Sequence, residues 1–237
     1  MTLPNTEELL RAAARNNAAW CAAVSAGGAF GADAWTSARR TPPYYPDAVT
    51  LTRDVAVAAL VAALDTDSPG CSVKDSFAVL DLAPQGFEVL FEAQWIHRPA
   101  ATAAPVRTPA PALSWSRVGD AAGLDRWEAA WDGEGGSGLF HPALLTGDVA
   151  FLAGRDADGR ILAGAVANAA AGVVGVSNVF AADGVGDDEA WAGALAGTAE
   201  LWPRLPVVGY EHGEDLRTAL RHGFAALGPL RVWLHTA

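Results

Sequence analysis

The sequence predicts a mixed α+β fold in which a mostly antiparallel central sheet is flanked by helices. Short apolar runs of strand length alternate with longer stretches of helical periodicity. Residues 148–181 hold three such runs in succession, separated by short turns, which is typical of antiparallel strands. Hydrophobic residues make up 51% of the chain and charged residues 18%, which favours a globular protein over a disordered one.

The first half, residues 1–98, is predicted to form an α/β unit. Thr6 is the expected N-cap of a helix that runs to Ser25, because Glu7 and Glu8 follow it in the first turn. A Pro-rich loop follows, and the later runs predict a strand over 48–52, a helix over 53–65 and strands over 72–82 and 86–98.

A Pro/Ala-rich segment, residues 99–113, is predicted to be a linker because it holds almost no core-forming side chains. The second half, residues 114–237, starts with a short strand over 114–118 and a helix over 121–132. The three consecutive strands come next, with turns at 156–159 and near 170–172. A helix over 187–202, a strand over 205–211, a helix over 214–222 and a strand over 223–235 complete the chain.

The charge balance argues against two classes of partner. The chain carries 16 Lys and Arg against 27 Asp and Glu, for a formal net charge of −11. Because nucleic-acid binding depends on neutralising phosphates, we expect no nucleic-acid partner, and no anionic membrane surface for the same reason. The N-terminal residues lack an apolar signal core, and no apolar window is long enough to span a membrane, so a cytoplasmic protein is expected.

Two local patterns carry a resemblance to a known family. The segment "NVFAADGVGDDEAW" places Gly184 and Gly186 between a strand and a helix, and "ALRHGFAALGPLRVWL" places Gly223-Phe224 between a helix and the last strand. In this order, over residues 114–235, the chain resembles the GNAT superfamily of N-acetyltransferases. The resemblance implies a GNAT-like sheet and an acetyl-CoA-dependent N-acyltransferase.

The first half is similar to the second in one respect. Gly86-Phe87 before the strand over 86–98 corresponds to Gly223-Phe224. This is consistent with a partial GNAT-like half fused before a fuller one, and equally with an unrelated α/β cap.

The resemblance implies positions for acetyl-CoA. Backbone amides of Gly184, Val185 and Gly186 would hold its pyrophosphate at the start of the helix. The backbone of the preceding strand would pair with the pantetheine arm, at Val176, Asn178 and Phe180.

The sequence departs from the family pattern at this loop and at the general acid. Ala181 replaces the Gln or Arg that precedes the first glycine, and acids follow the second glycine at Asp187, Asp188 and Glu189. Acids in a first helical turn contribute about 0.3–1 kcal/mol each to the helix, but they also repel phosphate. Ala219 replaces the Tyr that many family members use to protonate the leaving thiolate.

The catalytic candidates lie at the end of the strand over 205–211. Glu211 is the candidate general base, and Tyr210 is the candidate acid in place of the missing Tyr. The five His show no metal-ligand spacing, so no metal is expected. Neither Cys21 nor Cys71 has a neighbour in the sequence that would activate its thiol.

Two functions follow from these residues. The first is acetyl transfer to a small-molecule or protein amine, with a degenerate cofactor loop. The alternative is a non-catalytic GNAT-like protein that binds a small molecule or a protein partner, and the exposed Trp and Ala-rich sheet would permit a homodimer. Trp35, Tyr44 and Tyr45 beside the Pro-rich loop would either line a ligand pocket or pack beneath the loop.

Overall fold

The computed structural model describes residues 5–100, 102, 113–133 and 136–236. They form two compact units: one holds the described residues within 1–95 and 226–237, and the other those within 96–225. Most of the linker predicted over 99–113 lies outside the described residues, so the predicted division at that segment stays a prediction. Within the described ranges, none of the helices combines the length and the apolar character needed to cross a membrane.

The first unit begins with a helix whose start differs from the prediction. Asn5, not Thr6, is the N-cap of α1 (Thr6–Val24): its side chain accepts from the Glu8 amide, and Glu8 accepts from the Asn5 amide in return. This capping box satisfies two donors at the helix start. The other elements are β1 (Ala29–Phe30), β2 (Ala34–Thr36), β3 (Ala48–Thr50), α2 (Val57–Ala62), β4 (Ser72–Asp75), the 3-10 turn η1 (Ala83–Gln85), β5 (Phe87–Arg98) and β11 (Ala225–His235).

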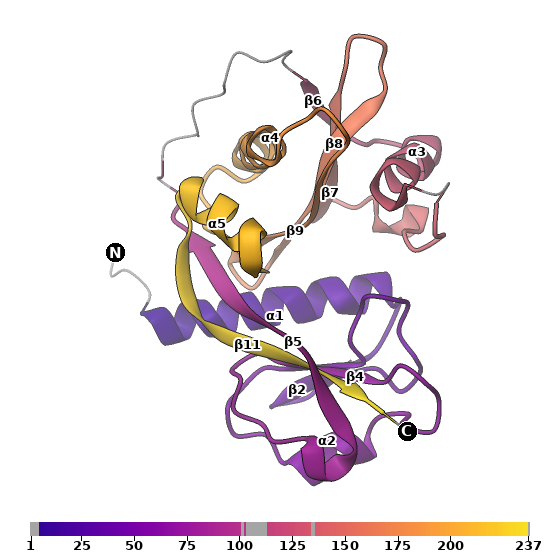
Figure 1. The fold of residues 1–237 in the computed structure, drawn as a ribbon, viewed down its shortest axis with the longest axis vertical. Helices are drawn as coiled ribbons and strands as arrows, with labels where there is room; N and C mark the ends of the chain where they lie inside the picture. Colours follow the sequence, from indigo (N-terminus) through magenta and orange to yellow (C-terminus); the bar gives the residue numbers. More distant parts are fainter. Residues whose placement is uncertain (1–4, 101, 103–112, 134–135, 237) are drawn as a thin grey trace. The chain divides into compact units, whose positions relative to one another are not determined.

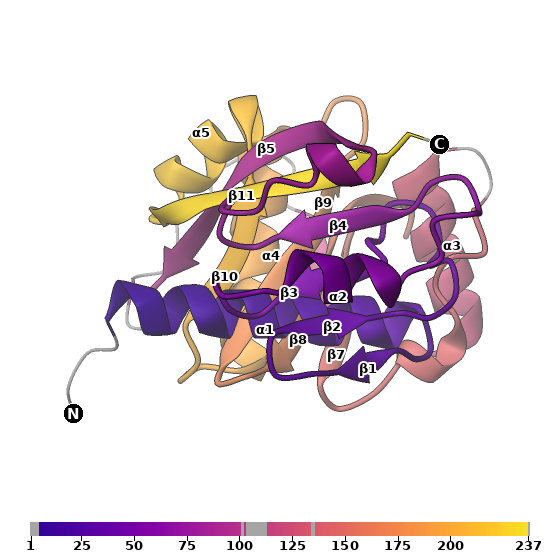
Figure 2. The same cartoon turned by 90° about the horizontal axis from the view of Figure 1, so that it is seen from below.

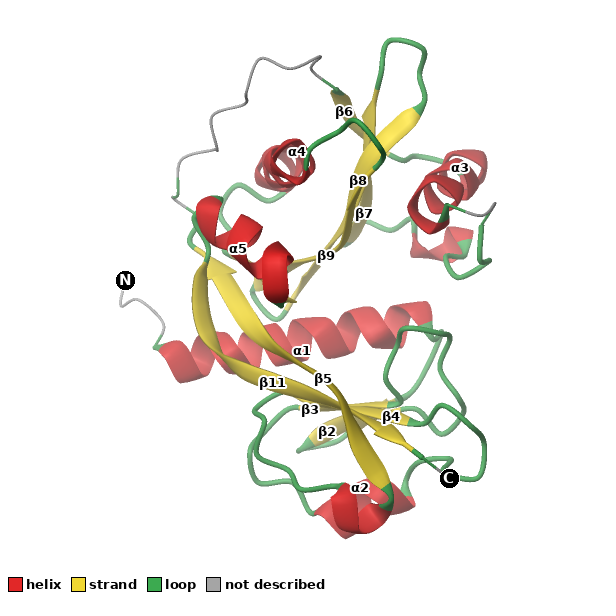
Figure 3. Ribbon diagram, viewed as in Figure 1, coloured by secondary structure: helices red, strands yellow, loops and turns green. Residues whose placement is uncertain are grey.

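The strands of the first unit lie in the order β1-β2-β3-β4-β11-β5. β11 is antiparallel to β4, with Val232 opposite Lys74, whereas β3 is parallel to β4. β5 and β11 run side by side as a long ribbon (Figure 2), and Arg231 on β11 pairs with Glu92 on β5 at 2.6 Å. α1 lies on one side of these strands and α2 on the other (Figure 3).

The predicted strand over 72–82 is only four residues long in the structure. The Asp75 carboxylate, fully buried, accepts from the amides of Phe77 (3.2 Å) and Leu80 (2.7 Å), and so turns the chain directly after β4. Leu80 and Leu82 then enter the core beside α2 instead of continuing the strand. The short strands β1 and β2 were not predicted, because Gly27, Gly28 and Gly31 in that stretch look like a simple break in the sequence.

The second unit has the strand order β10-β9-β8-β7-β6. Helix α4 lies on one face of these strands and α3 on the other (Figure 1). The mixed α/β fold with its mostly antiparallel strands is therefore confirmed; β6-β7, β7-β8 and β8-β9 are antiparallel, and β9 is parallel to β10. The elements are β6 (Ser114–Arg117), α3 (Ala121–Asp132), the 3-10 turn η2 (Pro142–Leu144), β7 (Val149–Arg155), β8 (Ile161–Ala170), β9 (Val173–Ala181), α4 (Asp187–Leu201), β10 (Val207–Glu211) and α5 (Gly213–Arg221).

Both predicted turns between the three antiparallel strands are present. Gly159 closes the first turn with φ +81°, and Ala171 and Gly172 form the second with φ 53° and +77°. Two successive positive φ values match the twist of the flanking strands and give a tight two-residue connection. The second turn sets Ala170 of β8 opposite Val173 of β9 and so fixes the register in which β9 starts.

The packing of α4 against the strands depends on Trp115 of β6. The indole lies between Gly154 of β7 and Gly193 of α4, and a Cβ built on Gly193 would lie 1.9 Å from Cε2 of Trp115. A Cβ on Gly154 would lie 2.8 Å from the same atom. The two glycines therefore provide the space that lets one large ring join helix and sheet.

We expect Gly193→Ala to lower the free energy of unfolding by about 1–3 kcal/mol, because the added methyl group overpacks against Trp115. Urea unfolding followed by fluorescence measures the loss. Gly197→Ala is the matched control: it gains the same helix propensity in α4, and its Cβ would first meet the movable end of Leu152 at 3.1 Å. A Gly193→Ala protein as stable as Gly197→Ala would contradict this packing.

Candidate active site

A β-bulge interrupts β9 directly before the glycine loop. Val166 of β8 lies opposite Ser177, but Gly164 lies opposite Phe180, so β9 carries one residue more than β8 between these pairs. Asn178 takes φ 51° at this point, a left-handed conformation that Asn tolerates better than most residues. The Ser177 hydroxyl donates to the Asn178 side-chain oxygen at 3.0 Å. Bulges bend a strand and take a residue out of the regular ladder.

The extra residue reverses which side chains face α4. Before the bulge, Val176 packs with Trp191 and Leu195 of α4; after it, Val179 packs in the same cluster. Without an extra residue, positions 176 and 179 would face opposite sides of the sheet. The ring of Phe180 therefore lies on the α3 face, where it covers Gly164 and meets Trp127 with ring centroids 5.4 Å apart.

β9 and β10 are paired over a short distance only. Val207 lies opposite Val174, and Val208 opposite Gly175. Among the described residues, this parallel register ends there, although β9 continues to Ala181 and β10 to Glu211. Gly209 comes close to β9 at the end of the pairing, since a Cβ on it would lie 3.0 Å from the Val176 carbonyl oxygen. The bulge and the loss of pairing thus occur at the same level of the sheet.

The loop from β9 to α4 presents an uncovered helix start. Gly184 adopts φ +87°, Gly186 is the N-cap of α4, and a Cβ on either glycine would meet no atom within 4 Å. Because Gly186 has no side chain, none caps the first turn of α4. Val185 closes the turn by donating its amide to Ala182 O at 3.0 Å. Open space and backbone amides at a helix N-terminus are the arrangement that binds phosphate.

One of the three acids after the loop is held by α5. The Asp188 carboxylate pairs with Arg221 at 3.2 Å and lies 2.9 Å from Nε2 of His222. The His222 carbonyl in turn accepts from Nε of Arg98 at 2.9 Å. Arg221 offsets the charge of Asp188, so the first turn repels an incoming phosphate less than its composition suggests. These contacts link residues 33 and 34 positions apart, and no pattern in the sequence indicated them.

The catalytic candidates Tyr210 and Glu211 are half-buried at the end of β10. Burial, reinforced by the nearby Asp215 carboxylate of α5, raises the pKa of Glu211 from its ordinary value of 4.5 to about 8. A carboxylate with a pKa in this range can exchange a proton with an amine near neutral pH. Ala219, at the position of the family's Tyr, is fully buried in the core and offers no proton donor.

The structure shows which groups the predicted cofactor residues Val176, Asn178 and Phe180 present. The side chain of Val176 is in the core, so only its backbone faces β10. The Phe180 ring is engaged with Trp127, and Asn178 sits at the bulge. Val176, Asn178 and Phe180 therefore act through backbone groups if they bind pantetheine, as the sequence predicted.

Both cysteine thiols are buried in the first unit, whereas the candidate site belongs to the second. Burial raises the pKa of Cys21 to about 11, and burial likewise raises the pKa of Cys71. A thiol with a raised pKa is a poor nucleophile at neutral pH, which agrees with the expectation that neither is reactive.

Comparisons with known proteins address the fold directly. No protein-family model matches the chain, and no curated protein matches it either. A GCN5-related N-acetyltransferase from Kribbella flavida has a similar structure, with a TM-score of 0.69 and 16% identity over 95% of this chain and 96% of that one. A protein of the GNAT family from Novosphingobium aromaticivorans gives a TM-score of 0.59 and 17% identity over 89% of this chain and 92% of that one.

The chain has the GNAT fold. A conserved protein of unknown function from Staphylococcus epidermidis is also similar, with a TM-score of 0.50 and 11% identity over 76% of this chain and 77% of that one. The similarity to the Kribbella protein extends over both units, whereas the sequence suggested the GNAT resemblance over residues 114–235. Identities this low establish the fold and leave the chemistry to the site.

The raised pKa of Glu211 predicts a pH-dependent stability. Between about pH 4.5 and 8 the folded state holds a proton that the unfolded state has lost, so the stability falls as the pH rises through this window. Glu211→Gln has no proton to lose at this position. We therefore expect the Tm of Glu211→Gln minus the Tm of wild type to increase from pH 5 to pH 9. Thermal unfolding at both pH values measures this gain. The exposed Glu200→Gln should show a constant difference, and a constant difference for Glu211→Gln would contradict the assignment.

Proposed function

We propose that this chain is an N-acyltransferase that takes the acetyl group from acetyl-CoA and transfers it to an amine. One observation carries the proposal: on a GNAT fold, β9 bulges and separates from β10 directly before an unobstructed glycine loop. A non-catalytic protein would not need to keep the unpaired stretch of β9 and the uncovered start of α4 together. Ala181 and Ala219 replace two side chains of the family pattern, but neither residue obstructs the glycine loop or the unpaired stretch of β9.

Acetyl-CoA would be held first by its pyrophosphate. The amides of Gly184 and Gly186 lie at the positive end of the α4 dipole, which favours an anion there, whereas the predicted Val185 amide already donates to Ala182 O. Asp187 is exposed and opposes this attraction, but the charge of Asp188 is offset by Arg221. The pantetheine arm would extend along β9, with its amides pairing with the backbone of Val176, Asn178 and Phe180 where β10 no longer does so.

The chemical step would be a direct attack. The amine nitrogen attacks the thioester carbonyl, the N–C bond forms, the C–S bond breaks, and the CoA thiolate leaves. Glu211 as carboxylate accepts the proton that the amine gives up, directly or through water. The thiolate takes a proton from Tyr210 or from water, because Ala219 supplies none.

The acceptor is proposed to be cationic, either a small molecule or a protein amine. The Asp215 carboxylate lies close enough to Glu211 to raise its pKa, so a negative charge at this end of β10 attracts a cationic acceptor. The net charge of −11 adds a long-range attraction for such acceptors.

We expect wild-type protein to bind acetyl-CoA with a Kd below about 100 μM in calorimetric titration. Gly184→Asp should weaken binding at least tenfold, because it adds a carboxylate beside the pyrophosphate and strains a positive φ. Gly159→Asp is the matched control, since Gly159 has φ +81° and equally open space in the turn between β7 and β8. No detectable binding at millimolar acetyl-CoA would overturn the proposal and favour a non-catalytic role.

We expect the rate of acetyl transfer to an amine panel of spermidine, lysine and a Lys-containing peptide to rise with pH through about 8, as Glu211 loses its proton. Glu211→Gln should lower kcat roughly 10²- to 10⁴-fold. Asp215→Asn should move the midpoint to lower pH, because it removes a charge that raises the pKa of Glu211. A Glu211→Gln enzyme with a wild-type pH profile would exclude Glu211 as the base.

A further inference from the structure

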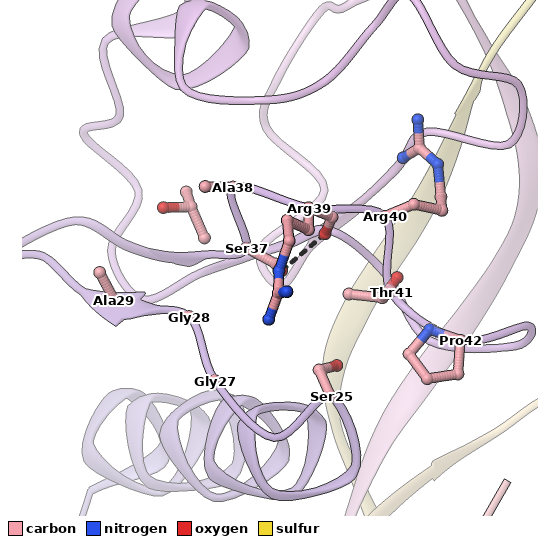
Figure 4. A pocket seen from close by; sticks show the side chains of 11 residues that line it. Ser25, Gly27, Gly28, Ala29, Ser37, Ala38, Arg39, Arg40, Thr41 and Pro42 are labelled. Atoms are coloured by element: carbon pink, nitrogen blue, oxygen red, sulfur yellow. Dashed lines mark hydrogen bonds between the residues drawn. The ribbon is translucent and has the colours of Figure 1, made fainter.

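The first unit contains a cavity of about 630 Å³ between the end of α1 and the segment that follows β2 (Figure 4). This volume is within the roughly 300–1,000 Å³ of small-molecule sites. Trp35, Tyr44 and Tyr45, expected either to line a pocket or to pack beneath the loop, do not line this cavity: Trp35 and Tyr45 are buried and Tyr44 is 79% exposed. The lining is formed by Ser25, Gly27, Gly28, Ala29, Thr36, Ser37, Ala38, Arg39, Arg40, Thr41 and Pro42.

The charge of this lining is opposite to that of the whole chain. Acids outnumber Lys and Arg by 27 to 16 in the sequence, yet the lining includes two arginines and no carboxylate. A cavity walled by cationic and hydroxyl groups favours an anionic occupant.

Arg40 is committed to the structure of the unit. It pairs with buried Asp47 at 2.5 Å and donates to the carbonyls of Asp65 (2.5 Å), Ser68 (2.6 Å) and Pro69 (3.1 Å). Asp47 also accepts from the amides of Thr41 (3.0 Å) and Ser72 (2.9 Å). The charge of Arg40 is therefore neutralised, and its role is to hold the segment in place.

Arg39 differs from its neighbour in this respect. Figure 4 shows its guanidinium directed across the cavity towards the end of α1. The Arg39 side chain is exposed. It forms no ion pair with any residue in the described part of the chain. Its backbone is fixed, because the Ser37 hydroxyl donates to the Arg39 carbonyl at 2.7 Å and the Ser37 amide donates to Asp47 O at 2.8 Å. The guanidinium is thus presented from a rigid segment.

Ser25 supplies a second polar group from the opposite wall. Its Oγ is buried and has no hydrogen-bond partner among the described residues, which is costly unless a ligand supplies one. The end of the α1 dipole opposes an anion, but the Cys21, Ala22 and Ala23 carbonyls there already accept from the amides of residues 25–27. Both residues line this cavity: the Arg39 guanidinium is directed into it, and the Ser25 hydroxyl lies in its wall without an acceptor among the described residues.

We propose that this cavity binds a small anionic molecule, with carboxylate or phosphate oxygens bound by the Arg39 guanidinium and Ser25 Oγ. The planar guanidinium offers two parallel donors that match both anions. The site lies within the first unit and uses none of the residues assigned to acetyl-CoA. Ala29, Ala38 and Pro42 give the remaining wall an apolar surface for the body of the ligand.

Calorimetric titration with benzoate, phenyl phosphate and benzamide tests the proposal. These probes share a ring and differ in the group presented to Arg39, so the first two distinguish a carboxylate from a phosphate ligand. We expect at least one anion to bind with a Kd below about 1 mM, and neutral benzamide to bind at least tenfold more weakly.

Variants locate the binding. Arg39→Gln should weaken binding of the anion at least tenfold, whereas Arg39→Lys should retain part of the affinity. Ser25→Ala should weaken binding of the anion a few-fold. Arg15→Gln, an exposed arginine on α1 outside the lining, should have no effect, and neither should Gly184→Asp, which affects the predicted cofactor loop.

Three results would overturn the proposal: no binding of either anion at 10 mM, equal binding of benzamide, or unchanged binding by Arg39→Gln. A loss of binding in Gly184→Asp would instead assign the anion to the α4 loop. Matching thermal unfolding curves for wild type and Arg39→Gln show that the variant is folded.

Discussion

One extra residue in β9 determines the arrangement around the candidate site. The bulge at Asn178 shifts the side-chain alternation, so that Val179 packs under α4 and Phe180 turns to the α3 face. The same stretch is where β9 and β10 cease to pair. The backbone of β9 is thereby separated from β10 just before the chain reaches Gly184 and α4. A regular ladder through these residues would leave no room for a ligand between the two strands.

Ion pairs change the local charge at both proposed anion sites of this acidic chain, one through an exposed pair and one through a largely buried pair. In the second unit, Arg221 offsets Asp188 at the start of α4, so an acid in the glycine loop's helix also serves to join α4 to α5. In the first unit, Arg40 and Asp47 neutralise each other and fix the segment that carries Arg39. In both places the local charge differs from the average of the chain, because some charged side chains are paired with an opposite charge and others are not.

Features with a local cause were predicted well. The turns at Gly159 and Gly172 were found because positive φ favours glycine, and α4 was found because its acids, apolar stripe and Pro203 mark its limits. Helix and strand ends that are set by side-chain contacts with backbone amides two to five residues away were not found. The strand over 72–82 ends early because Asp75 captures two amides, and Asn5 replaces Thr6 as the N-cap of α1 through its reciprocal bonds with Glu8. Boundaries of this kind depend on which side chain reaches which amide in space.

The sequence by itself determined the order of most elements and the position of the two loop glycines, and its resemblance to the GNAT superfamily suggested Glu211 as the candidate base. Only the tertiary structure decided the bulge at Asn178, the pairing of Asp188 with Arg221, the pKa of Glu211 and the cavity beside Arg39. Register, burial and ion pairing depend on distances between residues far apart in the sequence, and those distances exist only once the chain has folded.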